Sequence, residues 1–286
     1  MNFIKAHLIK ILTSLFCIVL IFFALRIVFD SHTANSGRKL GQEAAEIYEG
    51  AKTENNQKAE ESTVPGQPTS AQPNEASPEP SQDPQPREAV VRPEFSALQK
   101  EYDNEDIVGF LTIEGTSIKY PVVQAEDNDF YLLRDINKKS NQAGSIFLDY
   151  ENDIETGDMN TIIYGHNMKD NIMFHDLRKY SDFSFWQEHK YIQFNTLYDD
   201  MIFEIFSYYT PDVSFPYIYA NYEEKVFGNL LAKIDEMAHY DTGVNIKSTD
   251  RIIQLSTCTN TNDNTRMVIA GKLIELNGEK FQDLKQ

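Results

Sequence analysis

Cys258 is the residue of this 286-residue chain that most clearly indicates chemistry. The other cysteine, Cys17, lies in an apolar N-terminal run, where a thiol behaves as a small apolar side chain. Cys258 instead follows the apolar segment 251–255, within Leu-Ser-Thr-Cys-Thr, at the end of a predicted strand. Such a position is rigid yet can face solvent, which suits a nucleophile. A thiol attacks as the thiolate, so a basic or cationic neighbour is required.

His166 is the best candidate for that base among the six histidines. It follows the predicted strand 160–164 in Tyr-Gly-His-Asn, again at a strand end, and the preceding glycine permits close backbone approach. The other histidines flank the apolar run or lie in or beside predicted helices, where a packing or surface role is commoner. Spacing alone leaves open whether His166 and Cys258 meet.

Arg266 is the candidate for stabilising the oxyanion of an acyl transfer. A fixed hydrogen-bond donor at that oxygen contributes roughly 3 to 4 kcal/mol. Residues 259–265 are rich in Asn, Asp and Thr, which predicts a turn. A hairpin there would return Arg266 beside Cys258, and a guanidinium stays charged and offers several donors. The alternative is a surface arginine in an ion pair.

Eight short runs rich in β-branched and aromatic residues must position these side chains. Eight strands in one domain indicate a closed barrel, because closure leaves no open sheet edge. Amphipathic helices are expected over 222–240 and roughly 172–189, with a short helix over 96–102. The predicted strands are 107–113, 117–124, 144–150, 160–165, 190–196, 201–209, 251–257 and 266–275.

The N-terminal part predicts a membrane anchor. Residues 11–29 are apolar with three exceptions, and a helix of that length can span a bilayer. Lys5 and Lys10 precede the run and place the N-terminus in the cytoplasm by the positive-inside rule. A cleaved secretory signal is the alternative, although the run is longer than a usual signal core. Either way, the rest of the chain is exported.

A linker is expected between the anchor and the folded domain. Residues 30–50 could begin with a short helix, and residues 51–93 are rich in Pro, Gln, Ser and Glu. Such a composition buries too little apolar surface to offset its ordering entropy, so it predicts a disordered, extended spacer that contributes nothing to the fold. The expected segments are 1–29, cytoplasmic tip and transmembrane anchor; 30–93, extracellular linker; and 94–286, catalytic domain.

The composition also argues against some functions. A formal charge of −18 disfavours a nucleic-acid partner, which needs a basic surface to neutralise phosphates. No cluster of residues has metal-ligand spacing, so neither a metal nor another cofactor is expected.

Several long blocks in order give the chain a family resemblance over most of residues 95–275. They are similar to the sortases, and to class B most closely, which also has a helix before the cysteine strand. The blocks are DIVGFLTIEGTSIKYPVVQ (106–124), DNDFYL (127–132), GSIFLDY (144–150), TIIYGHNMKDNIMFHDLRKY (161–180), LSTCT (255–259) and TRMVIAGKL (265–273).

The resemblance implies a mainly β fold, an eight-stranded sortase-type closed barrel with peripheral helices. It maps the catalytic histidine, cysteine and arginine onto His166, Cys258 and Arg266. It also maps substrate-groove positions onto Asn128, Leu132 and Ser256, with further groove residues expected from the segment 208–219. The family often has an acidic residue shortly after the cysteine, where this chain has Asn260. A carboxylate there that orients the histidine is therefore in doubt.

The implied reaction is transpeptidation at the cell surface. Cys258 would cleave a C-terminal sorting signal after Thr, in an Asn-Pro-x-Thr or Leu-Pro-x-Thr-Gly type of motif, and form a thioester. An amino group of a peptidoglycan precursor would then resolve the thioester and leave a surface protein on the cell wall. The enzyme would remain in the cell membrane, through a single N-terminal helix, with its catalytic domain outside.

Other readings of the sequence remain. An L,D-transpeptidase has its histidine and cysteine two residues apart, and a papain-like hydrolase has the cysteine before the histidine; both arrangements differ from this chain. A non-enzymatic surface adhesin would share the anchor and spacer but would not need Cys258, His166 and Arg266. A pilin-polymerising sortase, which uses a lysine of another pilin as the final nucleophile, is also compatible with the sequence.

Overall fold

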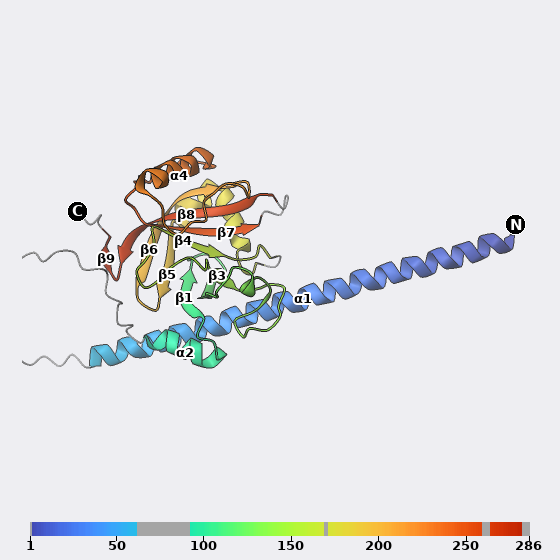
Figure 1. The fold of residues 1–286 in the computed structure, drawn as a ribbon. Helices are drawn as coiled ribbons and strands as arrows, with labels where there is room; N and C mark the ends of the chain where they lie inside the picture. The colour runs from blue at the N-terminus through green and yellow to red at the C-terminus, as the bar shows by residue number, and fades with distance from the viewer. Residues whose placement is uncertain (1, 62–91, 169–170, 259–263, 282–286) are drawn as a thin grey trace, which may run out of the picture.

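The fold is a closed β-barrel with helices packed around it (Figure 1). The computed structural model describes residues 2–61, 92–168, 171–258 and 264–281. The strands follow the order β6-β5-β1-β2-β3-β4-β7-β8, and pairing of β6 with β8 closes the barrel. The predicted mainly β, eight-stranded closed barrel is therefore confirmed. The strands are β1 Ile107–Thr112, β2 Lys119–Val123, β3 Ile146–Leu148, β4 Asn160–Tyr164, β5 Tyr191–Thr196, β6 Asp200–Tyr209, β7 Ile252–Cys258 and β8 Arg266–Leu276.

Each predicted run overlaps one of these strands, because β-branched and aromatic side chains fit a pleated surface with a buried face. The barrel interior is filled by apolar side chains, among them Leu111, Ile163, Phe203 and Ile269. A short ninth strand, β9 (Glu279–Lys280), pairs with the end of β8 and was not predicted from the sequence.

Short helices pack around the barrel. The helical stretch expected over 172–189 is divided at Asp182, whose backbone is extended and whose side chain accepts a hydrogen bond from Ser184 N at 2.9 Å. α4 lies on the side of the barrel opposite to α1 and α2 (Figure 1). These elements are α2 Pro93–Tyr102, η1 Phe130–Leu133, η2 His175–Ser181, α3 Phe183–Glu188 and α4 Glu224–Met237.

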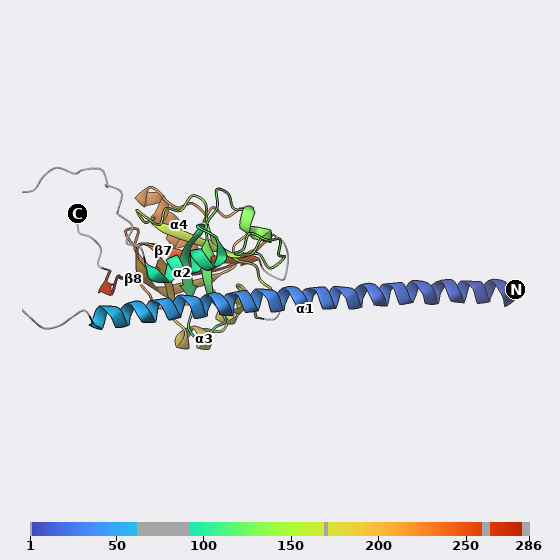
Figure 2. The same ribbon diagram turned by 90° about the horizontal axis from the view of Figure 1, so that it is seen from below.

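The N-terminal helix is longer than the sequence predicts. α1 runs without interruption from Asn2 to Glu61 and extends well beyond the barrel (Figures 1 and 2). The short helix expected within 30–50 is part of this helix, and the prediction of a disordered spacer from residue 51 is wrong as far as Glu61. Residues 30–61 contain no proline and many good helix formers such as Ala, Glu and Lys, so the helix can continue. The rest of the predicted linker, 62–91, lies outside the described residues.

Part of α1 belongs to the folded domain. Ala44, Ala45 and Tyr48 are buried with α2 and β1 in one apolar cluster. The Tyr48 ring stacks on Phe110 at 4.1 Å between ring centroids, and its hydroxyl accepts a hydrogen bond from Asn195 at 2.8 Å. A domain boundary at residue 94 therefore leaves out a segment of the core.

One glycine allows α1 to approach the barrel closely. A Cβ atom on Gly41 would lie 2.5 Å from the Tyr120 ring of β2, closer than real contacts allow. Only glycine can therefore occupy this position without a shift of the helix or of Tyr120.

The apolar half of α1 coincides with the predicted anchor. Among the residues that the structure describes, no helix combines the length and the apolar character needed to cross a membrane. The predicted anchor over 11–29 stays a prediction.

We expect Tyr48→Ala to lower the free energy of unfolding by about 3 kcal/mol, because it removes a buried aromatic ring and leaves a cavity. The measurement is urea denaturation of the full chain in detergent. Glu46→Ala is the matched control on the exposed face of the same helix, and it should change stability by less than about 0.5 kcal/mol. Equal stability of the two variants would show that α1 does not belong to the domain.

Candidate active site

The parallel pairing of β4 and β7 brings two strand ends to one edge of the barrel. Tyr164 of β4 pairs with Ser256 of β7, and Gly165 N donates a hydrogen bond to the Ser256 carbonyl oxygen at 3.3 Å. His166 follows β4 after this one glycine, and β7 ends at Cys258. Since parallel strands run in the same direction, the backbones of both candidate residues reach the same edge.

Arg266 is placed at this edge by the next strand pair. β7 and β8 are antiparallel, and Cys258 pairs directly with Arg266, as a hairpin requires. The Arg266 amide donates to the Pro211 carbonyl oxygen at 2.9 Å, which ties the start of β8 to the segment after β6. The residues 259–263 and the Cys258 side chain lie outside what the structure describes.

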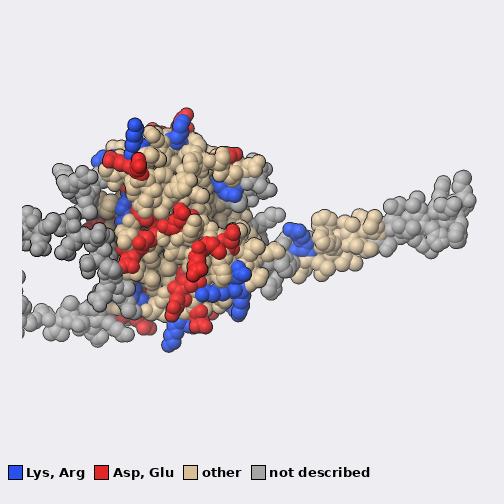
Figure 3. All heavy atoms as spheres, viewed as in Figure 1, with Lys and Arg blue, Asp and Glu red and all other residues tan. Residues whose placement is uncertain are grey.

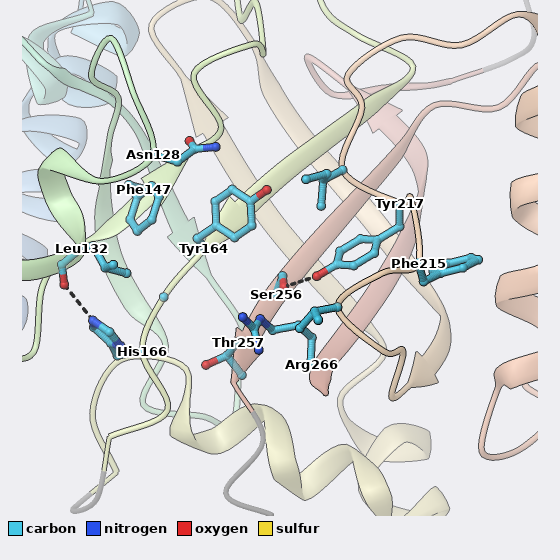
Figure 4. A pocket seen from close by; sticks show the side chains of 13 residues that line it. Asn128, Leu132, Phe147, Tyr164, His166, Phe215, Tyr217, Ser256, Thr257 and Arg266 are labelled. Carbon is cyan, nitrogen blue, oxygen red and sulfur yellow. Dashed lines mark hydrogen bonds between the residues drawn. The ribbon is translucent and has the colours of Figure 1, made fainter. Parts of the chain in front are cut away.

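A groove of about 320 Å³ runs along this edge (Figure 4). It contains five of the six side chains predicted from the sequence: Asn128, Leu132, His166, Ser256 and Arg266. In Figure 4, Leu132 and His166 lie on one side of the groove, and Tyr217, Phe215 and Arg266 on the other. The remaining lining residues are Phe147, Tyr164, Gly165, Val213, Ile218 and Thr257.

His166 is held by a main-chain group. Its Nε2 lies 2.7 Å from the carbonyl oxygen of Leu132 in η1. The His166 carbonyl oxygen accepts a hydrogen bond from Phe174 N at 3.0 Å, and Asn167 forms a β-bridge with Met173. The backbone and the ring of His166 are thus both tied to neighbouring segments.

A buried carboxylate lies behind the Asn128 end of the groove. Asp149 is 2% exposed, and its Oδ2 accepts hydrogen bonds from Asn128 Nδ2 at 2.9 Å and from the Tyr164 hydroxyl at 2.8 Å. Burial, and then the negative charge of Asp149, raise the pKa of Tyr164 well above its usual range. Its hydroxyl therefore stays protonated and donates. Asn128 Oδ1 accepts from Tyr150 N at 3.1 Å, so the orientation of the Asn128 amide is fixed.

A second polar network supports Ser256. The Ser256 and Tyr217 hydroxyls are 2.8 Å apart. Gln254 Nε2 donates to the Tyr217 carbonyl oxygen at 3.0 Å and to Asn160 Oδ1 at 2.8 Å. Asn160 in turn donates to the carbonyl oxygens of Tyr217 and Tyr219, at 2.9 Å each. These bonds fix the segment after β6 against β4 and β7.

Unnamed groove residues were expected from 208–219, and Val213, Phe215, Tyr217 and Ile218 of that segment line the groove. Phe147 and Tyr164 also line it and were not predicted. Their signal is the strand register, since Phe147 pairs with Tyr164, and Tyr164 pairs with Ser256. A row of paired residues shares one face of a sheet, but register is not visible in a single sequence.

Known proteins share this architecture. The family model "Sortase domain" matches residues 111–274. Sortase B of Listeria monocytogenes is 44% identical over 187 residues, which are 64% of this chain and 75% of that protein. Sortase B of Staphylococcus aureus is 36% identical over 189 residues, 65% of this chain and 77% of that protein.

Solved structures agree. A Staphylococcus aureus sortase B–substrate complex superposes with a TM-score of 0.61 at 35% identity, covering 65% of this chain and 86% of that one. Bacillus anthracis sortase B in complex with AAEK2 gives a TM-score of 0.66 at 35% identity, covering 87% and 98%.

The closed eight-stranded barrel and the match of the sortase family model over residues 111–274 show that the chain belongs to the sortase family. Within that family it is a class B sortase. It is therefore a cysteine transpeptidase that anchors surface proteins.

We expect Asp149→Asn to lower the free energy of unfolding by about 2 kcal/mol and to raise KM for a sorting-signal peptide. The two carboxylate oxygens of Asp149 accept hydrogen bonds from Glu151 N on one side and from Asn128 and Tyr164 on the other. An amide has only one acceptor oxygen, so its NH₂ group would have to face one of these sets of donors. Urea denaturation and peptide kinetics measure the two effects.

The matched control for this substitution is Asp129→Asn, an exposed position beside Asn128. It removes the same charge near the Asn128 end of the groove and should leave both quantities nearly unchanged. If the two variants behave alike, the effect comes from charge and not from the hydrogen bonds of Asp149.

Proposed function

We propose that this sortase cleaves a C-terminal sorting signal after Thr with Cys258 as nucleophile and transfers the protein to an amino group of a peptidoglycan precursor. The observation that supports this most strongly is the meeting of β4, β7 and β8 at one edge, beside the groove. That arrangement gathers His166, the end of the cysteine strand and Arg266 from distant parts of the sequence.

In the first half-reaction, the Cys258 thiolate attacks the threonine carbonyl carbon. A carbon–sulfur bond forms, and an electron pair moves to the carbonyl oxygen. Collapse of this tetrahedral intermediate breaks the carbon–nitrogen bond, and the leaving amine takes a proton from the His166 imidazolium. The product is a thioester between the surface protein and Cys258.

In the second half-reaction, the incoming amine attacks the thioester carbonyl carbon. It gives a proton to His166, and collapse of the second intermediate breaks the carbon–sulfur bond and restores the thiolate. Arg266 donates hydrogen bonds to the oxyanion or to the substrate backbone in both steps.

The groove determines how the sorting signal lies. Asn128, Leu132 and Ser256 are the proposed substrate contacts, and all three line the groove. The exposed apolar side chains of Val213 and Ile218, from the segment after β6, extend this surface. The similar sortase B of Staphylococcus aureus has been solved as a complex with its substrate.

We expect Cys258→Ala to abolish cleavage and the thioester adduct, since the other cysteine, Cys17, lies in α1. Arg266→Lys keeps the charge but loses the planar set of donors, so we expect kcat/KM to fall about 10²-fold. The measurements are cleavage of sorting-motif peptides by the full chain and mass spectrometry of the adduct.

Arg178→Lys is the matched control, because Arg178 is an exposed arginine of η2 outside the groove. It should keep full activity, and circular dichroism should show all variants folded. Near-normal activity of Arg266→Lys would mean that Arg266 is only a surface charge. A thioester elsewhere than Cys258 would overturn the proposed function.

The membrane anchor is the second part of the proposal. In α1 the side chains from Leu15 to Leu25 include many large apolar groups that are largely exposed. Contiguous exposed apolar surface of this kind marks a contact with a membrane or a protein. By contrast, Asp and Glu side chains are spread over the face of the domain in Figure 3. The proposed arrangement has the N-terminus in the cytoplasm and the barrel outside.

We expect protease added to intact, wall-stripped cells to release a fragment of the barrel domain, because the domain is proposed to be extracellular. Immunoblotting against the C-terminal part detects the fragment, and a cytosolic protein that stays intact is the control. Protection of the domain until the cells are lysed would show the opposite orientation.

A further inference from the structure

The inference concerns the imidazole of His166 and rests on the proposed function. We infer that the main-chain carbonyl of Leu132 is the orienting group of His166. It fixes the tautomer with a proton on Nε2, so Nδ1 is the atom that gives and takes protons in both half-reactions.

The first support is the contact itself. Nε2 lies 2.7 Å from the Leu132 carbonyl oxygen, a normal hydrogen-bond length. A carbonyl oxygen only accepts, so Nε2 must carry the hydrogen. In the neutral imidazole, Nδ1 is then the unprotonated nitrogen.

The second support is that the carbonyl is itself immobilised. The carbonyl oxygens on either side of it are used: Tyr131 O accepts from Ser145 N at 3.1 Å, and Leu133 O from Asn141 N at 3.0 Å. These bonds bind η1 to the segment before β3. Between them, the Leu132 oxygen is directed at the histidine.

Gly144 completes this arrangement. Its φ is +60°, and a Cβ atom there would lie 2.5 Å from the Leu132 oxygen. The Leu132 carbonyl therefore packs against the bare Cα of Gly144, and any larger residue would displace it.

The third support is direction. In Figure 4 the Leu132 carbonyl lies on the side of the ring away from Thr257 and Arg266. The two ring nitrogens point in different directions, so a hydrogen bond from Nε2 leaves Nδ1 for the proton transfers. In Ser-His-Asp triads a carboxylate performs this orienting role, and here a neutral main-chain group performs it.

The proton balance follows. Before the first step, the imidazolium carries hydrogens on both nitrogens. The hydrogen on Nδ1 goes to the leaving amine, and the neutral ring keeps the hydrogen on Nε2. The incoming amine then returns a proton to Nδ1, so the Nε2 hydrogen stays with the Leu132 carbonyl throughout.

The direct test is long-range ¹H–¹⁵N NMR of the full chain in detergent, labelled with ¹⁵N-histidine. Cys258→Ala removes the thiol, so His166 can be observed as a neutral ring at high pH, and His166→Gln assigns its signals. We expect a single tautomer with the proton on Nε2. A neutral ring with the proton on Nδ1, or an even mixture, would overturn the inference.

The functional test separates the Leu132 carbonyl from the Leu132 side chain. Gly144→Ala should displace the carbonyl, lower kcat about 10²-fold and introduce the other tautomer. Leu132→Ala keeps the carbonyl, so it should raise KM while kcat and the tautomer stay the same. Gly243→Ala is the control for backbone strain, since Gly243 has a φ of +71° and a Cβ atom there would meet no other atom within 4 Å.

The outcomes are distinct. If Gly144→Ala keeps the wild-type kcat and tautomer while it is folded, the carbonyl does not position His166. If Gly144→Ala does not fold, the NMR tautomer with the native Gly144 still decides the question. Activity remaining in Cys258→Ala would instead refute the proposed function and leave the tautomer result valid.

Discussion

The parallel pairing of β4 with β7 is the constraint on which the site depends. Tyr164 lies opposite Ser256, and both strands end at the same edge, so the residues that follow them meet there. An antiparallel pair would have placed His166 and Cys258 at opposite ends of the barrel. Side chains alternate between the two faces of a strand, so a slip of one residue in this register would also turn every side chain to the other face.

Closure of the barrel supplies the opposite wall of the groove. β6 pairs with β8, and the segment after β6 is bound to the start of β8 through the Arg266 amide and the Pro211 carbonyl. Tyr217 then reaches Ser256, and the Gln254–Asn160 pair holds its backbone. The apolar wall of the groove is therefore a consequence of the β6–β8 pairing that closes the barrel.

Main-chain groups do much of the positioning in this site. The Leu132 carbonyl binds the His166 ring, the Pro211 carbonyl binds the Arg266 amide, and the Ser256 carbonyl binds the Gly165 amide. A main-chain acceptor in a paired segment has little conformational entropy left to lose. It can therefore position a partner at a lower entropic cost than a long, flexible side chain can. Gly144 and Gly41 serve the same purpose, because each allows a carbonyl or a ring to pack against bare backbone.

The sequence by itself determined the local features of this protein. The runs of β-branched residues predicted all eight barrel strands, and the positions of Cys258, His166 and Arg266 at strand ends identified the candidate site. These signals are local, because strand propensity, turn composition and residue type depend on near neighbours. Only the tertiary structure decided that Ala44 and Tyr48 of α1 belong to the core, that Asp149 holds Asn128, and that the Leu132 carbonyl holds His166. Each of these contacts joins residues far apart in the chain, so it depends on the fold and not on near neighbours. The Leu132 carbonyl is also chemically the same as every other backbone carbonyl, so no pattern of amino-acid types could identify it.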